Sequence, residues 1–152
     1  MASSIDVDIS TVPRMDRLTD MSSGHERQIR RVLAEYCQLC DDGEFEKLVA
    51  RFAPDGAFHF GGRTVEGHKA LISWFEVTQA PAERGKHITS NAVIDIEGDL
   101  ARVSSDFVFF GIVDGVLQLR IAGRYCDEFR RIDRRWVIKS REARVLRNPA
   151  AG

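Results

Sequence analysis

Four long segments in the second half of the chain have the pattern of β-strands, and the short turns between them constrain the fold more than any other feature. The segments cover residues 86–96, 100–113, 116–132 and 136–146. The turns between them are Glu97-Gly98-Asp99, Asp114-Gly115 and Asp133-Arg134-Arg135. Such short connections join antiparallel neighbours, because parallel strands need a crossover of about a dozen residues or more. The sequence therefore predicts an antiparallel meander over residues 86–146.

The first half of the chain has helical periodicity instead. After the capping-box sequence Ser23-Gly24-His25-Glu26, apolar residues recur every three or four positions up to a stop signal at Gly43. Two further helices are expected over residues 44–52 and 66–78, with a short strand at residues 57–60 between them. Helices followed by strands indicate the α+β class.

Alternation along the third strand segment predicts which side chains face the core. One face is expected to hold Leu117, Leu119, Ile121, Gly123, Tyr125 and Phe129. The other face is expected to hold Gln118, Arg120, Arg124 and Glu128. A sheet with one apolar face should curl around the three N-terminal helices and bury that face against them.

Length and charge exclude several classes of protein. The 152 residues suit one domain, which we place at residues 22–147, after an arm at 1–21 that carries no period and before a tail at 148–152. Lys and Arg number 22 and Asp and Glu 23, and this balance argues against a nucleic-acid partner. No apolar run approaches the roughly 18 residues of a membrane span, so no membrane contact is expected. The N-terminus lacks the apolar segment of a secretory signal, and the expected location is the cytoplasm.

The cysteine and histidine spacings predict neither a metal site nor a cofactor. Cys37 and Cys40 form a lone C-x-x-C near the C-terminal end of the first helix, whereas a redox C-x-x-C lies at a helix N-terminus. No second cysteine pair completes a zinc site, and the four histidines lack metal-ligand spacing. The three thiols are expected to be reduced and to serve in packing.

Four stretches of the chain, in the same order, resemble the SnoaL-like group of the NTF2-like superfamily. They are residues 36–57, 65–71, 86–91 and 123–138, so the resemblance extends over roughly residues 25–146. It implies a cone of α+β structure, with a deep apolar pocket between the curved sheet and the helices, and a homodimer or homotrimer. Members of the superfamily include dehydratases, isomerases, a dehydrochlorinase and polyketide cyclases, and also the small subunits of ring-hydroxylating dioxygenases.

The first candidate constellation is the pair Asp41 and His87. A histidine can act as a base near pH 7, and a carboxylate that fixes its tautomer improves it. On a helical wheel Asp41 falls on the flank of the apolar face, whereas Asp42 falls on the opposite side. The two positions match the Asp–His pair of scytalone dehydratase, bile acid 7α-dehydratase and hexachlorocyclohexane dehydrochlorinase, and the resemblance implies that His87 is the base. From spacing alone, a solvated helix-terminal Asp and a surface His are the alternative.

Tyr36 and Arg141 are the other catalytic candidates. Tyr36 lies in the middle of the apolar face of the first helix, and its hydroxyl could donate to a developing enolate or a departing hydroxide. Arg141 is expected to share a strand face with Val137, Ala143 and Val145, where the dehydrochlorinase has its catalytic arginine, and to hold an anionic or polar group. The alternatives are a core tyrosine with a satisfied hydroxyl and an outward arginine paired with an acid across a strand.

The expected lining of the pocket is aromatic, which suits a ring-containing ligand. Phe60 stands where ketosteroid isomerase has its catalytic Asp, which argues against steroid isomerisation. His59 alternates with Phe58 and Phe60 and should face away from the pocket. Asp106 is a candidate second acid, with an ordinary surface carboxylate as the alternative. The predicted substrate-binding residues are Phe58, Phe60, Trp74, Phe107, Tyr125 and Asp106.

These residues predict a cofactor-independent lyase or isomerase that acts on a small, hydrophobic, cyclic substrate, with dehydration favoured. The alternative is a non-catalytic module of the same fold, either a ligand-binding protein or a subunit like the oxygenase small subunit.

Overall fold

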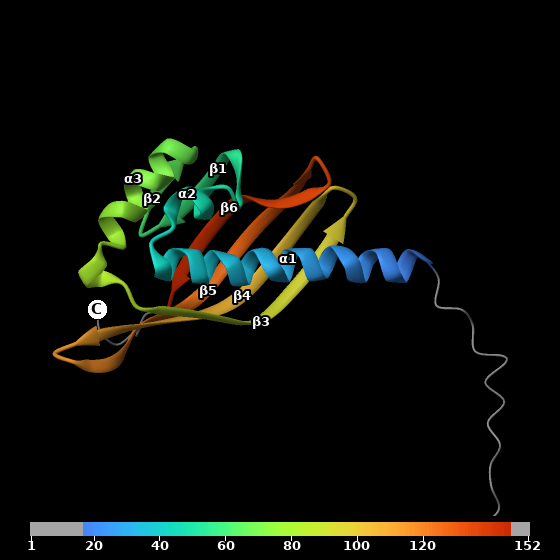
Figure 1. Cartoon of the computed structure of the whole chain (residues 1–152). Helices are drawn as coiled ribbons and strands as arrows, with labels where there is room; N and C mark the ends of the chain where they lie inside the picture. Colours follow the sequence, from blue (N-terminus) through green and yellow to red (C-terminus); the bar gives the residue numbers. More distant parts are fainter. Residues whose placement is uncertain (1–16, 147–152) are drawn as a thin grey trace, which may run out of the picture.

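The computed structural model describes residues 17–146 and the side chains from residue 22 onward (Figure 1). In chain order the elements are α1 (Arg17–Asp42), α2 (Phe45–Val49), β1 (Phe52–Phe60), β2 (Arg63–Glu66), α3 (His68–Thr78), a 3-10 turn (Pro81–Glu83), β3 (Lys86–Glu97), β4 (Leu100–Val113), β5 (Val116–Ile132) and β6 (Arg135–Val145). Most of the expected arm, residues 1–16, and the expected tail, residues 148–152, lie outside this range.

The strands form one six-stranded sheet in the order β2-β1-β6-β5-β4-β3. The predicted meander is confirmed, since β3, β4, β5 and β6 pair antiparallel in sequence. Asp114 and Gly115, at the β4–β5 turn, both have positive φ, at 51° and 77°. Two consecutive residues with positive φ are typical of the two-residue hairpin turn that matches the twist of the strands. The α+β class is therefore confirmed, with one parallel contact, between β1 and β6.

The first helix begins earlier than the capping box predicts. Helix α1 passes straight through Ser23 and Glu26, and residues 17–21 of the expected arm form its first turns. A capping box inside a helix has no free N–H groups to cap, because the preceding turn already supplies their carbonyl partners. The predicted stop is confirmed, since Gly43 has φ 72° and its N–H donates to the carbonyl of Cys40 at 3.2 Å.

The segment after α1 differs from the prediction in the extent of its elements. Helix α2 ends at Val49, and β1 starts at Phe52 rather than Ala57 because Phe52 already pairs in parallel with Ile138 of β6. Gly61 and Gly62 both have positive φ and turn the chain into β2, a short strand that the sequence did not predict. Helix α3 consequently begins at His68 instead of residue 66.

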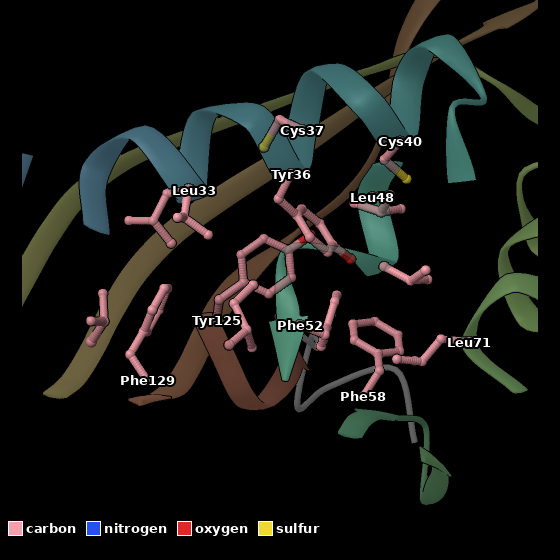
Figure 2. Packing of buried hydrophobic residues seen from close by; sticks show 14 of the residues in the cluster. Leu33, Tyr36, Cys37, Cys40, Leu48, Phe52, Phe58, Leu71, Tyr125 and Phe129 are labelled. Carbon is pink, nitrogen blue, oxygen red and sulfur yellow. The ribbon is translucent and has the colours of Figure 1, made fainter. Parts of the chain in front are cut away.

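The helices pack on one face of the curved sheet. Figure 1 shows α1 lying along that face, with α2 and α3 gathered at one end. Figure 2 shows Tyr36 pointing from α1 into a cluster with Tyr125, Phe52 and Phe58 of the sheet. The fully buried members of this core include Ile29, Leu48, Leu71 and Ile138. No described helix combines the length and apolarity needed to cross a membrane.

Two one-residue bulges overturn part of the predicted face assignment. Phe109 pairs with Ile121 but Phe110 pairs with Leu119, so Arg120 has no partner on β4. Because side chains alternate along a strand, one unpaired residue reverses which of the residues after it point to the core and which point to solvent. Leu117 and Leu119 are therefore 61% and 56% exposed, and not on the core face with Ile121.

The second bulge is at Lys139 on β6. Glu128 pairs with Ser140 but Phe129 pairs with Ile138, which leaves Lys139 unpaired. The buried residues of β6 are consequently Trp136 and Ile138 before the bulge and Arg141 and Ala143 after it. The prediction that Arg141 shares a face with Val137 is wrong for this reason.

Candidate functional site

A cavity of about 270 Å³ lies between the helices and the inner face of the sheet. This volume is near the lower end of the range for small-molecule sites. The central cavity, as we call it, has apolar walls formed mainly by Phe58, Phe60, Trp74, Phe75, Phe107, Phe109 and Ile121. The polar residues that line it are Tyr36, Thr78, Gln79, Glu83, Arg84, His87, Arg120 and Tyr125. Of the six predicted substrate-binding residues, all but Asp106 line it.

Asp41 and His87 meet at the wall of the central cavity. The Nδ1 atom of His87 lies 2.6 Å from Oδ1 of Asp41, and the side chains are only 10% and 3% exposed. The backbone N–H of His87 also donates to Asp41, at 3.1 and 3.2 Å to the two carboxylate oxygens. Since Nδ1–H donates to the carboxylate, Nε2 carries the free lone pair. His87 lines the cavity, so the geometry makes it available as a base.

The end of α1 explains why Asp41 reaches this position. Asp41 is buried and Asp42 is exposed, as the helical wheel predicts. Gly43 then turns the chain away, and β3 begins at Lys86 beside the last turn of the helix. Lys86 lies on the solvent side of the pair, with its Nζ 3.7 Å from Oδ2 of Asp41. The ring of His87 packs on Phe109 at a centroid distance of 4.5 Å, which restricts its rotation.

Two tyrosines bring hydroxyl groups to the central cavity. The ring of Tyr36 packs against Phe75 at 6.2 Å and Tyr125 at 5.9 Å, and Tyr125 stacks on Phe107 at 4.1 Å. Burial is the main cause that raises the pKa of Tyr36 well above its ordinary value, and it also raises the pKa of Tyr125. Both groups therefore remain phenols at neutral pH and can donate a hydrogen bond to a ligand.

Arg141 lies behind these tyrosines and does not line the cavity. Its guanidinium is 0% exposed and sits 4.1 Å from each of the Tyr36 and Tyr125 ring centroids. It donates to both oxygens of Asp127, at 2.8 and 2.7 Å. Burial alone would lower the pKa of Arg141, but the Asp127 carboxylate raises it, so the guanidinium stays charged. Arg141 is therefore paired with an acid across a strand, as in the alternative prediction. The pair lies on the inner side of the sheet, however, and not on the outer side.

Asp106 lies on the opposite face of the sheet from the cavity, so its prediction as a substrate-binding residue is wrong. Its carboxylate accepts hydrogen bonds from Arg124 at 2.7 Å and Asn91 at 2.9 Å. These bonds, with that from Arg124 foremost, lower the pKa of Asp106. His59 also lies away from the cavity, as predicted, and its ring nitrogens contact Thr64 and Ser140.

A larger hollow of about 680 Å³ holds none of the predicted catalytic residues. Its lining includes outward residues of the sheet such as Arg102, Glu128, Glu142 and Arg144. Arg144 and Glu142 neutralise each other there at 2.7 Å. Among the described residues, no group of three or more His, Cys, Asp or Glu side chains is arranged to hold a metal ion.

Sequence reasoning missed five polar residues of the central cavity: Thr78, Gln79, Glu83, Arg84 and Arg120. Gln79 and Arg84 lie just after α3, in a segment with no periodic pattern. Arg120 was predicted to face outward, and only the bulge turns it to the cavity.

Comparisons with known proteins agree with this architecture. Residues 22–142 match the SnoaL-like domain family. A protein of unknown function from Mycobacterium tuberculosis superposes with a TM-score of 0.83 at 26% identity, over 87% of this chain and 78% of that one. A "Putative Scytalone Dehydratase" from Novosphingobium aromaticivorans gives 0.75 at 24%, over 85% and 89% of the two chains. The beta subunit of a "putative aromatic-ring-hydroxylating dioxygenase" from the same bacterium gives 0.70 at 21%, over 84% and 94%.

No curated protein gives a significant sequence match. Solved structures with the same architecture are described as NTF2-like and cystatin-like. Since the family match extends over most of the chain and the fold agrees with it, the protein belongs to the SnoaL-like domain family.

Proposed function

We propose that the protein is a cofactor-independent lyase that abstracts a proton from carbon and eliminates a leaving group, most simply water, from a small cyclic substrate. The observation that carries this proposal is the Asp41–His87 pair, joined at 2.6 Å and placed at the wall of an aromatic cavity. A buried carboxylate that holds Nδ1–H stabilises the imidazolium that forms when Nε2 takes a proton.

The proposed reaction balances without a co-reactant. Nε2 of His87 takes the proton from the carbon beside the one that bears the hydroxyl. The electron pair of the C–H bond forms the carbon–carbon double bond, and the C–O bond breaks. The imidazolium then returns its proton to the departing hydroxide, which leaves as water, and His87 is neutral again. Tyr36 donates a hydrogen bond to a carbonyl or to the leaving oxygen during these steps.

The surroundings of the pair support such chemistry. The aromatic walls lower the effective dielectric around the pair, and this strengthens the interaction between Asp41 and the imidazolium. They also suit the apolar body of a ring compound. Phe60 provides no second base in the cavity, which favours elimination over a proton shift between two carbons.

Proton abstraction can be tested before the natural substrate is known. A panel of cyclic ketones and hydroxyketones is incubated with the protein in D₂O, and exchange at the α-carbon is followed by NMR. We expect exchange that is abolished in His87→Ala and strongly slowed in Asp41→Asn. Asp42→Asn is the matched control, because Asp42 is the exposed neighbour of Asp41. Undiminished exchange in His87→Ala would remove His87 as the base.

The second candidate is a non-catalytic module, and the likeness to a dioxygenase beta subunit supports it. Under that proposal the panel compounds bind without exchange or turnover, and Asp41 and His87 serve only to join α1 to β3. The predictions of a homodimer or homotrimer and of a cytoplasmic location stay predictions, to be checked by light scattering and by fractionation.

A further inference from the structure

Two arginines, the half-buried Arg84 and the exposed Arg120, are among the residues that line the central cavity. Neither forms an ion pair with any described residue, whereas Arg124, Arg130 and Arg144 elsewhere on the sheet each bind a carboxylate. Glu83 is the acidic residue among the described residues that line the cavity, and it is exposed and pairs with neither arginine. The Asp41 carboxylate at the cavity wall is already paired with His87 and Lys86, so the two arginines have no carboxylate partner among the described residues.

The guanidinium of Arg84 is held in place by three neighbours. Its Nε donates to the carbonyl of Gln79 at 3.0 Å, and the group lies over the ring of Phe45 at 5.6 Å. It also fills the space beside Gly43, where any Cβ would collide with it. The hydrogen bond from Nε fixes the orientation of the Arg84 guanidinium and leaves its two terminal nitrogens for another acceptor.

Arg120 faces the cavity because of the bulge in β5. Without the register shift between Phe109 and Phe110, alternation would place it on the outer face. Its side chain then lies along Gly111, and a Cβ there would be 3.2 Å from Cγ of Arg120. The bulge and the glycine on the facing strand thus act together to admit a long cationic side chain.

The backbone next to Arg84 lies close to the strand that Arg120 contacts. Gly85, next to Arg84, packs so closely on the backbone of Phe110 that no Cβ would fit between them. Phe110 is in turn the neighbour of Gly111, which Arg120 contacts. His87 lies on the same segment as Arg84 and also lines the cavity. Gln79, which also lines the cavity, has a buried Oε1 without a partner, and a half-turn of its amide would present the NH₂ donor instead.

We infer that the central cavity takes a ring compound bearing a carboxylate, with the ring among the aromatic walls and the carboxylate between Arg84 and Arg120. Guanidinium groups bind carboxylates with two parallel hydrogen bonds, so the acid would fix the direction of the ring relative to His87. This inference rests on the proposed function only in taking the central cavity as the substrate site.

The test compares two probes with the same ring, one with a charged carboxylate and one with a neutral ester. Binding of 2-naphthoate and of its methyl ester is measured by calorimetry near neutral pH, at low and at high salt. We expect the wild-type protein to bind the acid at least about tenfold tighter than the ester, with a preference that salt weakens. Equal affinity for acid and ester would overturn the inference.

Variants then locate the effect. Arg84→Gln and Arg120→Gln should each lose about tenfold in affinity for the acid and leave that for the ester unchanged, whereas Arg120→Lys should keep part of the preference. Arg102→Gln is the matched control, since Arg102 lies outside the central cavity and forms no ion pair with a described residue. An equal loss in Arg102→Gln would show general charge attraction and would overturn the site.

The result separates this inference from the proposed function. His87→Ala should keep the preference for the acid while it loses α-proton exchange. The protein could show α-proton exchange that depends on His87 and yet bind the acid no tighter than the ester. That result would support the lyase proposal and overturn the carboxylate site. Circular dichroism of each variant, together with its unchanged affinity for the ester, shows that the fold is intact.

Discussion

Asp41 binds one histidine twice, through the ring Nδ1 of His87 and through the backbone N–H of the same residue. The carboxylate therefore fixes both the start of β3 and the tautomer of the ring that β3 carries. The position of the base and its tautomer therefore both depend on the side chain of Asp41, in the last turn of α1.

Replacing this carboxylate should separate its two roles. In Asp41→Asn the amide oxygen can still accept from the backbone of His87, but it no longer stabilises an imidazolium. We expect α-proton exchange to fall by about 10²–10⁴-fold while the thermal midpoint changes little. Asp42→Asn should match the wild type in both measurements. Equal exchange in the two variants would contradict the assigned role of Asp41.

The buried pair of Asp127 and Arg141 should matter for stability more than its surface counterpart. Asp127→Ala leaves an uncompensated guanidinium in the core, and we expect a loss of about 3–5 kcal/mol in the free energy of unfolding. Asp106→Ala breaks the exposed pair with Arg124 and should cost about 0–1 kcal/mol. Urea unfolding measures both.

A companion variant shows whether the charges of this pair are needed at all. Asp127→Leu combined with Arg141→Met replaces the ion pair by apolar side chains and should cost much less than Asp127→Ala alone. A double variant as unstable as the single one would show that the tyrosines depend on the guanidinium for their packing. Its effect on α-proton exchange then measures what Arg141 contributes behind Tyr36.

Tyr36 should make the protein less stable in alkaline solution. Burial raises the pKa of Tyr36 above its value in the unfolded chain, so the folded state retains a proton that the unfolded state releases. This contribution is fully present below about pH 10 and is lost as the pH rises above it. We expect the urea midpoint to fall as the pH rises above about 10, the ordinary tyrosine pKa, and to fall less steeply in Tyr36→Phe. Identical slopes would argue against a buried phenol.

The cysteines of the C-x-x-C should react slowly with thiol reagents. Burial raises the pKa of both Cys37 and Cys40, which leaves little thiolate at pH 8, roughly half a unit below the ordinary thiol pKa. Cys126 is only half-buried and should be alkylated first. Peptide mapping after partial alkylation gives the order, and all three should react at once in denaturant. Early labelling of Cys37 would indicate an opening of α1 from the sheet.

The elements that depend on local patterns were predictable. The turn residues at Asp114 and Gly115 specify a hairpin by themselves, and the apolar spacing of α1 places Asp41 inward and Asp42 outward. The approach of Asp41 to His87 follows from the resemblance and not from spacing, since 46 residues separate them.

What could not be predicted depends on pairing between strands. Nothing in the sequence around Arg120 or Lys139 marks them as unpaired, because a bulge is a property of two strands in register. The face of Arg141 and the inward turn of Arg120 were therefore missed together. Asp106 could have been placed correctly, because it is the immediate neighbour of Phe107 on a strand and the two side chains cannot both face the cavity.

The bulge at Arg120 also means that the cavity can be rebuilt by a change in length rather than in chemistry. Removing Arg120 from β5 would restore regular alternation, with Leu119 still paired to Phe110 on the outer face and no long side chain in place of the arginine. The cavity would lose one of its two lining arginines while every remaining side chain kept its identity. Among relatives, a one-codon deletion in this strand would thus remove a cation from the cavity without any substitution, and a gap that an alignment places a few positions away would conceal the difference.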